Sequence, residues 1–245
     1  MLKPSLTLFS LLLATAAALP AGISSSLGSQ HAGHLATRGG CTTRAEQVQG
    51  TSSDTNGRGV QVKNADSQSR SFFVYANSCD YVPLKYVTLG AGQSAFVSLP
   101  QAFQGRIVRG TTQVNLDGRP HLLGTWLEIG LDGDGSGKGW ADVSLIRGCD
   151  GAVSVAAADG TGASTGFQDS SILDDAPGDA LEAKDSGSKV IKATEGLLSV
   201  VVEAARDYLA SKLGYDKAYI DDYHGNPVIC SSNERFSATF YRGRP

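Results

Sequence analysis

Residues Gly124 to Val155 read GTWLEIGLDGDGSGKGWADVSLIRGCDGAVSV, and this stretch decides the fold. Apolar and polar side chains alternate from Thr125 to Leu131 and again from Trp140 to Ile146, which is the period of a half-buried strand. A run of Gly, Asp and Ser separates the two segments, as between the strands of a hairpin. The sequence therefore predicts two strands that each bury one face.

Each of these strands carries one acidic residue in its interior, Glu128 in the first and Asp142 in the second. In a suitable register both carboxylates point to the same surface. Glycoside hydrolysis needs such a pair, one carboxyl protonated as the acid and one ionised as the base or nucleophile. The alternative interpretation is that both are ordinary solvated charges on the outer face of a hairpin.

The first residues are typical of an export signal. Lys3 precedes a mostly apolar run over residues 6–13, and small residues suited to cleavage follow. We therefore expect a signal peptide at 1–18, a flexible Ser- and Gly-rich leader or pro-segment at 19–56, and one domain at 57–245. The predicted localisation is secreted, extracellular or associated with a cell wall.

Composition excludes several classes of partner. The formal net charge is −3, and no cluster of Lys and Arg is present to neutralise phosphates. We therefore expect no nucleic acid partner and no membrane partner, and a monomer. Thirty glycines and few long helical patterns favour an all-β body.

The remaining chain predicts further strands, one loop and one helix. Short β-prone runs bounded by turn residues suggest a sandwich or barrel; they are 60–62, 71–76, 82–89, 93–99, 105–109 and 235–241. Residues 156–188 are poor in aliphatic side chains and are expected to form a long acidic loop of low complexity. Helical spacing over 189–213, followed by Gly214, predicts a helix in the C-terminal half.

The chain contains four cysteines, Cys41, Cys79, Cys149 and Cys230. An even number in an exported chain favours two disulfides, and three pairings are possible. The wide spacing matches no zinc motif. The run that begins at Asp132 imitates the start of an EF-hand loop, but its twelfth position is Val143. No metal and no cofactor are therefore expected.

Four stretches together resemble a known family. They are FFVYANSCDYVPLKYVTLGAGQS (72–94), GRIVRG (105–110), the paired TWLEIGL (125–131) and WADVSLIRG (140–148), and AYIDDYHGNPVICSSNERFSATFY (218–241). They are similar to the thaumatin-like proteins, in the short, cysteine-poor form found among secreted fungal proteins. The resemblance implies a flattened β-sandwich with long irregular loops and a cleft lined by carboxylates.

In that family the cleft is associated with binding of β-1,3-glucan, with weak endo-β-1,3-glucanase activity in some members, and with antifungal action. Carried onto this chain, the resemblance implies catalytic roles for Glu128, Asp142 and Asp221 and substrate binding by Arg109 and Asp222. Trp126 and Trp140 are further candidates for substrate binding because aromatic rings stack on sugars, although buried aromatic side chains are the commoner case.

The chain also departs from the family pattern. It has far fewer cysteines and lacks the terminal one, so the resemblance implies the pairs Cys41–Cys79 and Cys149–Cys230. Arg147 stands where the family has a further acid. These departures favour a rival hypothesis, a non-catalytic effector or cell-wall interaction protein whose partner is a secreted or host protein. An active endo-β-1,3-glucanase is the second rival.

Overall fold

A computed structural model describes residues 40–50, 52, 54, 56–132, 135–196 and 200–245. The predicted signal peptide and most of the predicted leader lie outside the described residues. The described part of the chain forms fourteen strands and two α-helices, so the predicted mainly β class is confirmed. None of the described helices is long and apolar enough to cross a membrane.

The larger sheet has seven strands in the order β1-β4-β3-β6-β7-β8-β13. Its strands are β1 (Glu46–Val48), β3 (Arg70–Ala76), β4 (Lys85–Leu89), β6 (Gln104–Gly110), β7 (Trp126–Leu131), β8 (Gly139–Ser144) and β13 (Ile229–Ser231). Neighbours are antiparallel except β1 and β4. The predicted hairpin is present as β7 and β8, near one edge of this sheet.

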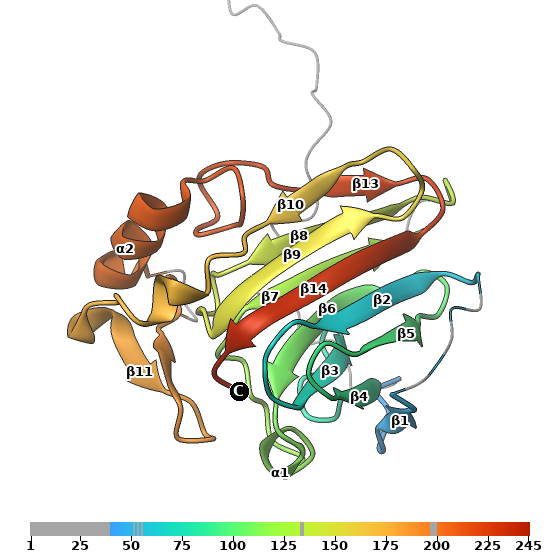
Figure 1. Ribbon diagram of the computed structural model, residues 1–245, viewed down its shortest axis with the longest axis horizontal. Helices are drawn as coiled ribbons and strands as arrows, with labels where there is room; N and C mark the ends of the chain where they lie inside the picture. Colours follow the sequence, from blue (N-terminus) through green and yellow to red (C-terminus); the bar gives the residue numbers. More distant parts are fainter. Residues whose placement is uncertain (1–39, 51, 53, 55, 133–134, 197–199) are drawn as a thin grey trace, which may run out of the picture. The chain divides into compact units, whose positions relative to one another are not determined.

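The second sheet has five strands in the order β10-β9-β14-β2-β5. They are β2 (Gly59–Asn64), β5 (Ser94–Ser98), β9 (Gly151–Ala157), β10 (Ser164–Gly166) and β14 (Arg235–Gly243). In Figure 1 this sheet lies in front, with β3, β6, β7 and β8 behind it. The predicted sandwich is therefore formed by two sheets packed face to face.

Alternation decides which side chains enter the core between the sheets. Leu127 and Ile129 of β7 and Val143 of β8 are buried there, against Val153 of β9 and Phe240 of β14. The residues between them on β7 and β8, which include both predicted acids, therefore lie on the outer face of the seven-stranded sheet. A second, smaller group of buried aromatic and aliphatic side chains covers part of that outer face, namely Phe73, Tyr75, Val108 and Trp126.

The predicted helix is shorter than expected. The helix α2 spans Glu203–Leu213 and ends before Gly214, as predicted, but residues 189–191 form the strand β12 (Lys189–Ile191). β12 pairs with β11 (Leu181–Ala183), and its β-branched residues Val190 and Ile191 are completely buried. The predicted start of the helix was therefore wrong. The apolar residues of a short buried strand fitted the helical spacing by chance, because a short apolar run is compatible with either structure.

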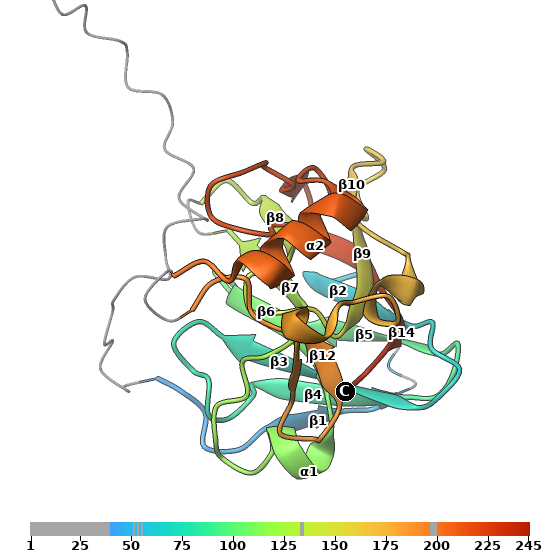
Figure 2. The same ribbon diagram turned by 90° about the vertical axis from the view of Figure 1, so that its left-hand side faces the viewer.

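The segment 156–188 is also more ordered than the predicted loop. It contains β10, β11 and two short 3₁₀ helices, η1 (Ser170–Leu173) and η2 (Gly178–Ala180). Phe167, Ile172 and Leu173 are buried and join the main core. Three apolar anchors are enough to hold a polar segment onto an existing core, although it could not fold alone. Figure 2 looks at the end of the molecule where α2 and the β11–β12 hairpin lie.

Candidate functional site

A row of four polar side chains, Tyr75, Arg106, Glu128 and Asp142, crosses the outer face of the seven-stranded sheet. The strand registers pair Tyr75 with Arg106, Arg106 with Glu128, and Glu128 with Asp142. Side chains directly opposite on neighbouring strands lie roughly 5 Å apart at Cβ. The register thus places both predicted acids side by side on one surface, as the alternation indicated.

Burial shifts the pKa values of both acids upward. Burial raises the pKa of Glu128 to about 7, and the negative charge of Asp222 adds to the rise, while Arg106 and Arg147 oppose it. The pKa of Asp142 is raised well above its ordinary value, by burial first and by Glu128 second. Two facing carboxyls that resist ionisation keep protons in mildly acidic solution. They can then both donate and accept hydrogen bonds.

The carboxyl of Asp142 is almost fully enclosed, with 4% of the residue exposed. Its Oδ1 atom has no hydrogen-bond partner among the described residues. Glu128, in contrast, is only half-buried and forms the side of the pair that faces outward. Glu128 is therefore the member of the pair that a ligand can reach, and the enclosed Asp142 lies directly beside it.

Arg106 is the cation of this row, and sequence reasoning missed it. Its guanidinium lies over the rings of Trp126 at 4.1 Å and Tyr75 at 4.8 Å, and Nη2 donates to Oδ1 of Asp80 at 2.7 Å. These contacts hold it beside Glu128, where its charge lowers the pKa of that acid. Alternation along β6 was the signal for it, because Ile107 faces the core and its neighbour must face outward.

Two further acids of the site come from segments that are distant in the sequence from β7 and β8. A bridge between Ser144 and Tyr219 brings the turn 219–222 beside the end of β8. The backbone N–H of Asp222 donates to Oε1 of Glu195 at 2.9 Å, and burial raises the pKa of both acids. We call Glu128, Asp142, Glu195 and Asp222 the acidic site.

Arg147 lies within the field of three acids of this site. Its charge lowers the pKa of Glu128, of Glu195 and of Asp222, and its Nη1 donates to the backbone carbonyl of Glu195 at 3.4 Å. Sequence reasoning missed Glu195, because the residue fell inside the predicted helix. Its contact with Asp222 depends on tertiary packing and leaves no local signal.

Asp221, for which the resemblance implied a catalytic role, is buried and turned away from the outer surface. The residue is 1% exposed, and its Oδ1 accepts from the backbone N–H groups of Tyr223 at 3.0 Å and His224 at 2.9 Å. The ring nitrogen Nδ1 of His224 lies 2.9 Å from Oδ2. The carboxylate is thus occupied in closing its own turn, and Asp222 is the member of the pair that faces outward.

The assignment of Arg109 to substrate binding is wrong. Arg109 shares the inner face of β6 with Ile107 and is 1% exposed. Its Nη1 donates to Oδ1 of Asp150 at 2.6 Å, and Nη2 donates to the carbonyl of Tyr241 at 2.9 Å. Lys184 completes this buried network, with Nζ 2.8 Å from Oδ2 of Asp150. No substrate can reach the guanidinium, so its role is structural.

The two predicted tryptophans differ in exposure. Trp126 is 6% exposed beneath Arg106, and its Nε1 donates to the carbonyl of Leu122 at 2.9 Å, so stacking of its ring on a sugar is excluded. Trp140 is half-buried on the same face of β8 as Asp142. Only the second tryptophan can present an aromatic surface beside the acids.

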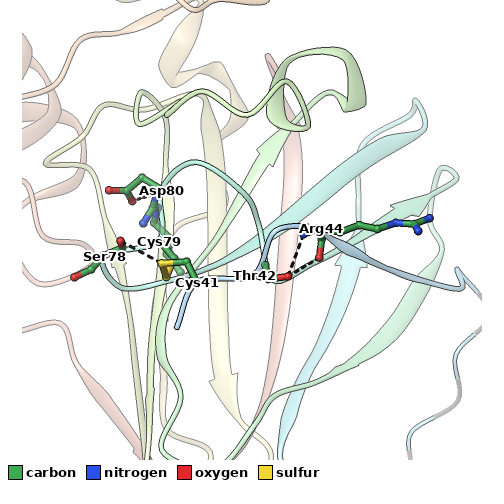
Figure 3. The surroundings of a disulfide bond; sticks show 7 residues. Cys41, Thr42, Arg44, Ser78, Cys79 and Asp80 are labelled. Carbon is green, nitrogen blue, oxygen red and sulfur yellow. Dashed lines mark hydrogen bonds and ion pairs between the residues drawn. A yellow bond between two sulfur atoms is a disulfide. The ribbon is translucent and has the colours of Figure 1, made fainter. Parts of the chain in front are cut away.

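One of the two predicted disulfides is present. Cys41 and Cys79 are bonded, with Cα atoms 5.5 Å apart (Figure 3). The pair Cys149–Cys230 is wrong, and both thiols are free. Cys149 is buried in the core, whereas Cys230 lies on the exposed side of β13, between the buried Ile229 and Ser231. The two cysteines therefore lie in different surroundings: Cys149 forms an isolated bridge with Ile191 in the core, and Cys230 is exposed on β13.

Two cavities lie outside the acidic site. One of about 230 Å³ is bounded by His121, Lys184 and the C-terminal Pro245. The other, of about 420 Å³, is bounded by Arg44, Tyr81 and Tyr86. The described residues contain no group of three or more His, Cys, Asp and Glu that could hold a metal ion.

Comparison with known proteins gives similarities of fold only. No known family model matches the chain, and no curated protein matches it. The thaumatin-like xylanase inhibitor TLXI is similar in structure over 74% of this chain and 98% of its own, with a TM-score of 0.39 and 11% identity. The protein elicitor MoHrip2 from Magnaporthe oryzae is similar over 45% of this chain and 77% of its own, with a TM-score of 0.33 and 13% identity. The chain is mainly β and similar to a thaumatin-like protein, as the sequence predicted.

Proposed function

We propose that the protein is secreted and binds a neutral cell-wall polysaccharide, with β-1,3-glucan as the first candidate, through the acidic site. The observation that carries the proposal is the pair Glu128 and Asp142, two facing carboxyls with raised pKa on the outer face of a sheet. Protonated carboxyls match sugar hydroxyls, which also both donate and accept hydrogen bonds. The Cys41–Cys79 disulfide supports export, since disulfides persist in oxidising compartments.

The charges around the pair favour a neutral ligand. Arg106 and Arg147 lie close enough to lower the pKa of Glu128, so the site contains both signs of charge. A polyanion would meet the acids, and a polycation would meet the half-buried Arg147. The half-buried ring of Trp140 adds an apolar surface on which a sugar ring can stack.

A second candidate function is weak endo-β-1,3-glucanase activity. The pKa of Glu128 near 7 suits a general acid, because such a group is protonated and can still release its proton. The partner must be an ionised carboxylate. Asp142 is a poor choice because its pKa is raised well above the ordinary range, which leaves the exposed Asp222 as the base or nucleophile.

The test is a pull-down on insoluble β-1,3-glucan, with release of reducing sugar measured in the same tube. Glu128→Ala removes the carboxyl, and we expect it to abolish most of the binding at every pH. Glu128→Gln keeps a neutral group of the same shape, so its binding should persist above about pH 7, where that of the unmodified chain falls as Glu128 ionises. Any sugar release should stop in both variants.

Glu182→Ala is the matched control, because Glu182 is an exposed acid on β11 outside the acidic site. It should bind as the unmodified chain does. If folded Glu128→Ala binds glucan as strongly as this control, the acidic site is not the binding site. Binding without sugar release would identify a lectin-like site and rule out the hydrolase.

A further inference from the structure

A second concave surface lies toward the opposite edge of the seven-stranded sheet. It is the cavity of about 420 Å³, within the range of small-molecule sites. Three segments form it: residues 43–47 leading into β1, residues 81–86 leading into β4, and residues 116–118 after the helix α1 (Thr112–Asn115). We call this surface the tyrosine groove. It shares no residue with the acidic site.

Exposed apolar side chains gather at the tyrosine groove. The described residues include four large apolar side chains that are exposed, and two of them, Tyr81 at 48% and Leu116 at 39%, border this one cavity. Tyr86 is held in place by stacking on Phe73, with ring centroids 5.8 Å apart and an angle of 16° between the rings. Because the Tyr86 ring is already held in place, a flat apolar ligand that packs against it loses little side-chain entropy on binding.

The polar side chains of the groove carry opposite charges. Arg44 lies on one wall and Asp117 on the other, and both are exposed. Asp117 is fixed by the N–H of Arg119 at 2.8 Å and by Nε2 of His121 at 2.9 Å. A charged ligand would meet a like charge on one wall, whereas hydroxyl groups can bond to both walls.

The Cys41–Cys79 disulfide holds two of the three walls together. Arg44 follows Cys41 by three residues and Tyr81 follows Cys79 by two, so the cross-link sets the separation of their segments. Figure 3 shows the side chain of Arg44 extending away from the disulfide. A covalent link beside a groove reduces the freedom that a ligand would otherwise have to remove on binding.

We propose that the tyrosine groove binds a sugar ring of a neutral oligosaccharide, with Tyr81 stacked on the ring and Arg44 and Asp117 bonded to its hydroxyls. A pyranose ring has an apolar face and hydroxyl groups at its edge. The groove offers tyrosine rings to the face and the charged side chains of Arg44 and Asp117 to the hydroxyls. The groove is a site separate from the acidic site, because β4 and β7 are three strands apart, about 14 Å at the usual strand spacing.

The test maps binding by NMR on the ¹⁵N-labelled chain. Hexamers of β-1,3-linked glucose, β-1,4-linked glucose and β-1,4-linked N-acetylglucosamine serve as the probes. At least one hexamer should shift the amide signals of residues 43–47, 81–86 and 116–118. Tyr81→Phe keeps the ring and should retain binding at these amides, whereas Tyr81→Ala should weaken it about tenfold, the effect of about one lost stacking contact.

Two controls keep this proposal separate from the previous one. Val200→Ala removes another exposed apolar side chain, outside the groove, and should leave binding at the groove unchanged. Glu128→Ala should also leave it unchanged, even if that variant loses all binding to insoluble glucan. The proposal fails if no hexamer moves the groove amides, or if Tyr81→Ala binds as Tyr81→Phe does. Binding of a proline-rich peptide there, with every sugar inactive, would assign the groove to a protein partner and overturn it.

Discussion

Two arginines of one strand show how position along a strand decides the role of a residue. Arg106 and Arg109 are three residues apart on β6, and an odd separation puts them on opposite faces. Arg106 reaches the outer face beside Glu128, and Arg109 enters the core and pairs with Asp150. Motif similarity selected Arg109, whereas the alternation around Ile107 selects Arg106. For identifying the arginine at the acidic site, the face of the strand on which a residue lies is a better guide than motif similarity.

The free cysteines give a prediction at the residue scale. Iodoacetamide should label Cys230 in the native chain, since this thiol is exposed. Cys149 should stay unlabelled until denaturant is added, because it is buried and burial raises its pKa to about 11. Mass mapping of unreduced peptides should find Cys41 linked to Cys79. A peptide that links Cys149 to Cys230 would contradict the structure.

At the scale of elements, the β11–β12 hairpin is tied to the sandwich by charge. Lys184, which follows β11, reaches Asp150 at the start of β9, and Asp150 also neutralises Arg109. The Asp150 and Arg109 side chains are fully buried, so each charge depends on the other for compensation. This network adds a buried charge contact to the apolar anchors Phe167, Ile172 and Leu173 that hold the segment 156–188 on the core.

Asp150→Asn should therefore be strongly destabilising. It leaves the Arg109 guanidinium buried without a counter-ion, and loss of one partner of a buried pair costs about 3–5 kcal/mol. The free energy of unfolding in urea measures the effect. Asp175→Asn is the control: it removes the exposed partner of Lys212, with N and O 3.2 Å apart, and should cost less than about 1 kcal/mol. Equal effects of the two substitutions would mean that the buried network does not stabilise the fold.

At the scale of the whole molecule, one core between two sheets supports both candidate sites. Leu127 and Val143 anchor β7 and β8 from the inner side, which fixes Glu128 and Asp142 on the outer side. The same sheet carries Tyr86 on β4, next to the edge strand β1 at its other side. The protein thereby holds its functional side chains on strands of a rigid sheet, where a small shift in position is costly.

The acidic site should make the stability of the whole chain depend on pH. Burial raises the pKa of Glu128 from 4.5 to about 7, so the folded state holds its proton more tightly than the unfolded state does. The resulting stabilisation is complete below about pH 4.5 and is lost as the pH rises through about 7. Its size is on the order of 2 kcal/mol, with allowance for the partial exposure of the group.

Urea unfolding at about pH 5 and about pH 8 measures this dependence. The free energy of unfolding should fall between the two values in the unmodified chain and change less in Glu128→Gln, which cannot ionise. Glu182→Gln, on the exposed side of β11, should behave as the unmodified chain does. A stability that is equal at both pH values, or the same slope in Glu128→Gln, would show that Glu128 is not buried as described.

The sequence by itself determined the strands β2 to β8 and β14, the β7–β8 hairpin and the face on which Glu128 and Asp142 lie. These follow from alternation at period two, which is a local property of the chain. Only the tertiary structure decided that Glu195 and Asp222 join that pair and that Cys149 and Cys230 stay apart. The position of Glu195 and Asp222 depends on the packing of distant segments, through the hydrogen bond from Thr194 to the carbonyl of Ile220 and the bridge between Ser144 and Tyr219. The local sequence pattern determines which face of a strand a side chain occupies. The packing of distant segments determines which other side chains it contacts there.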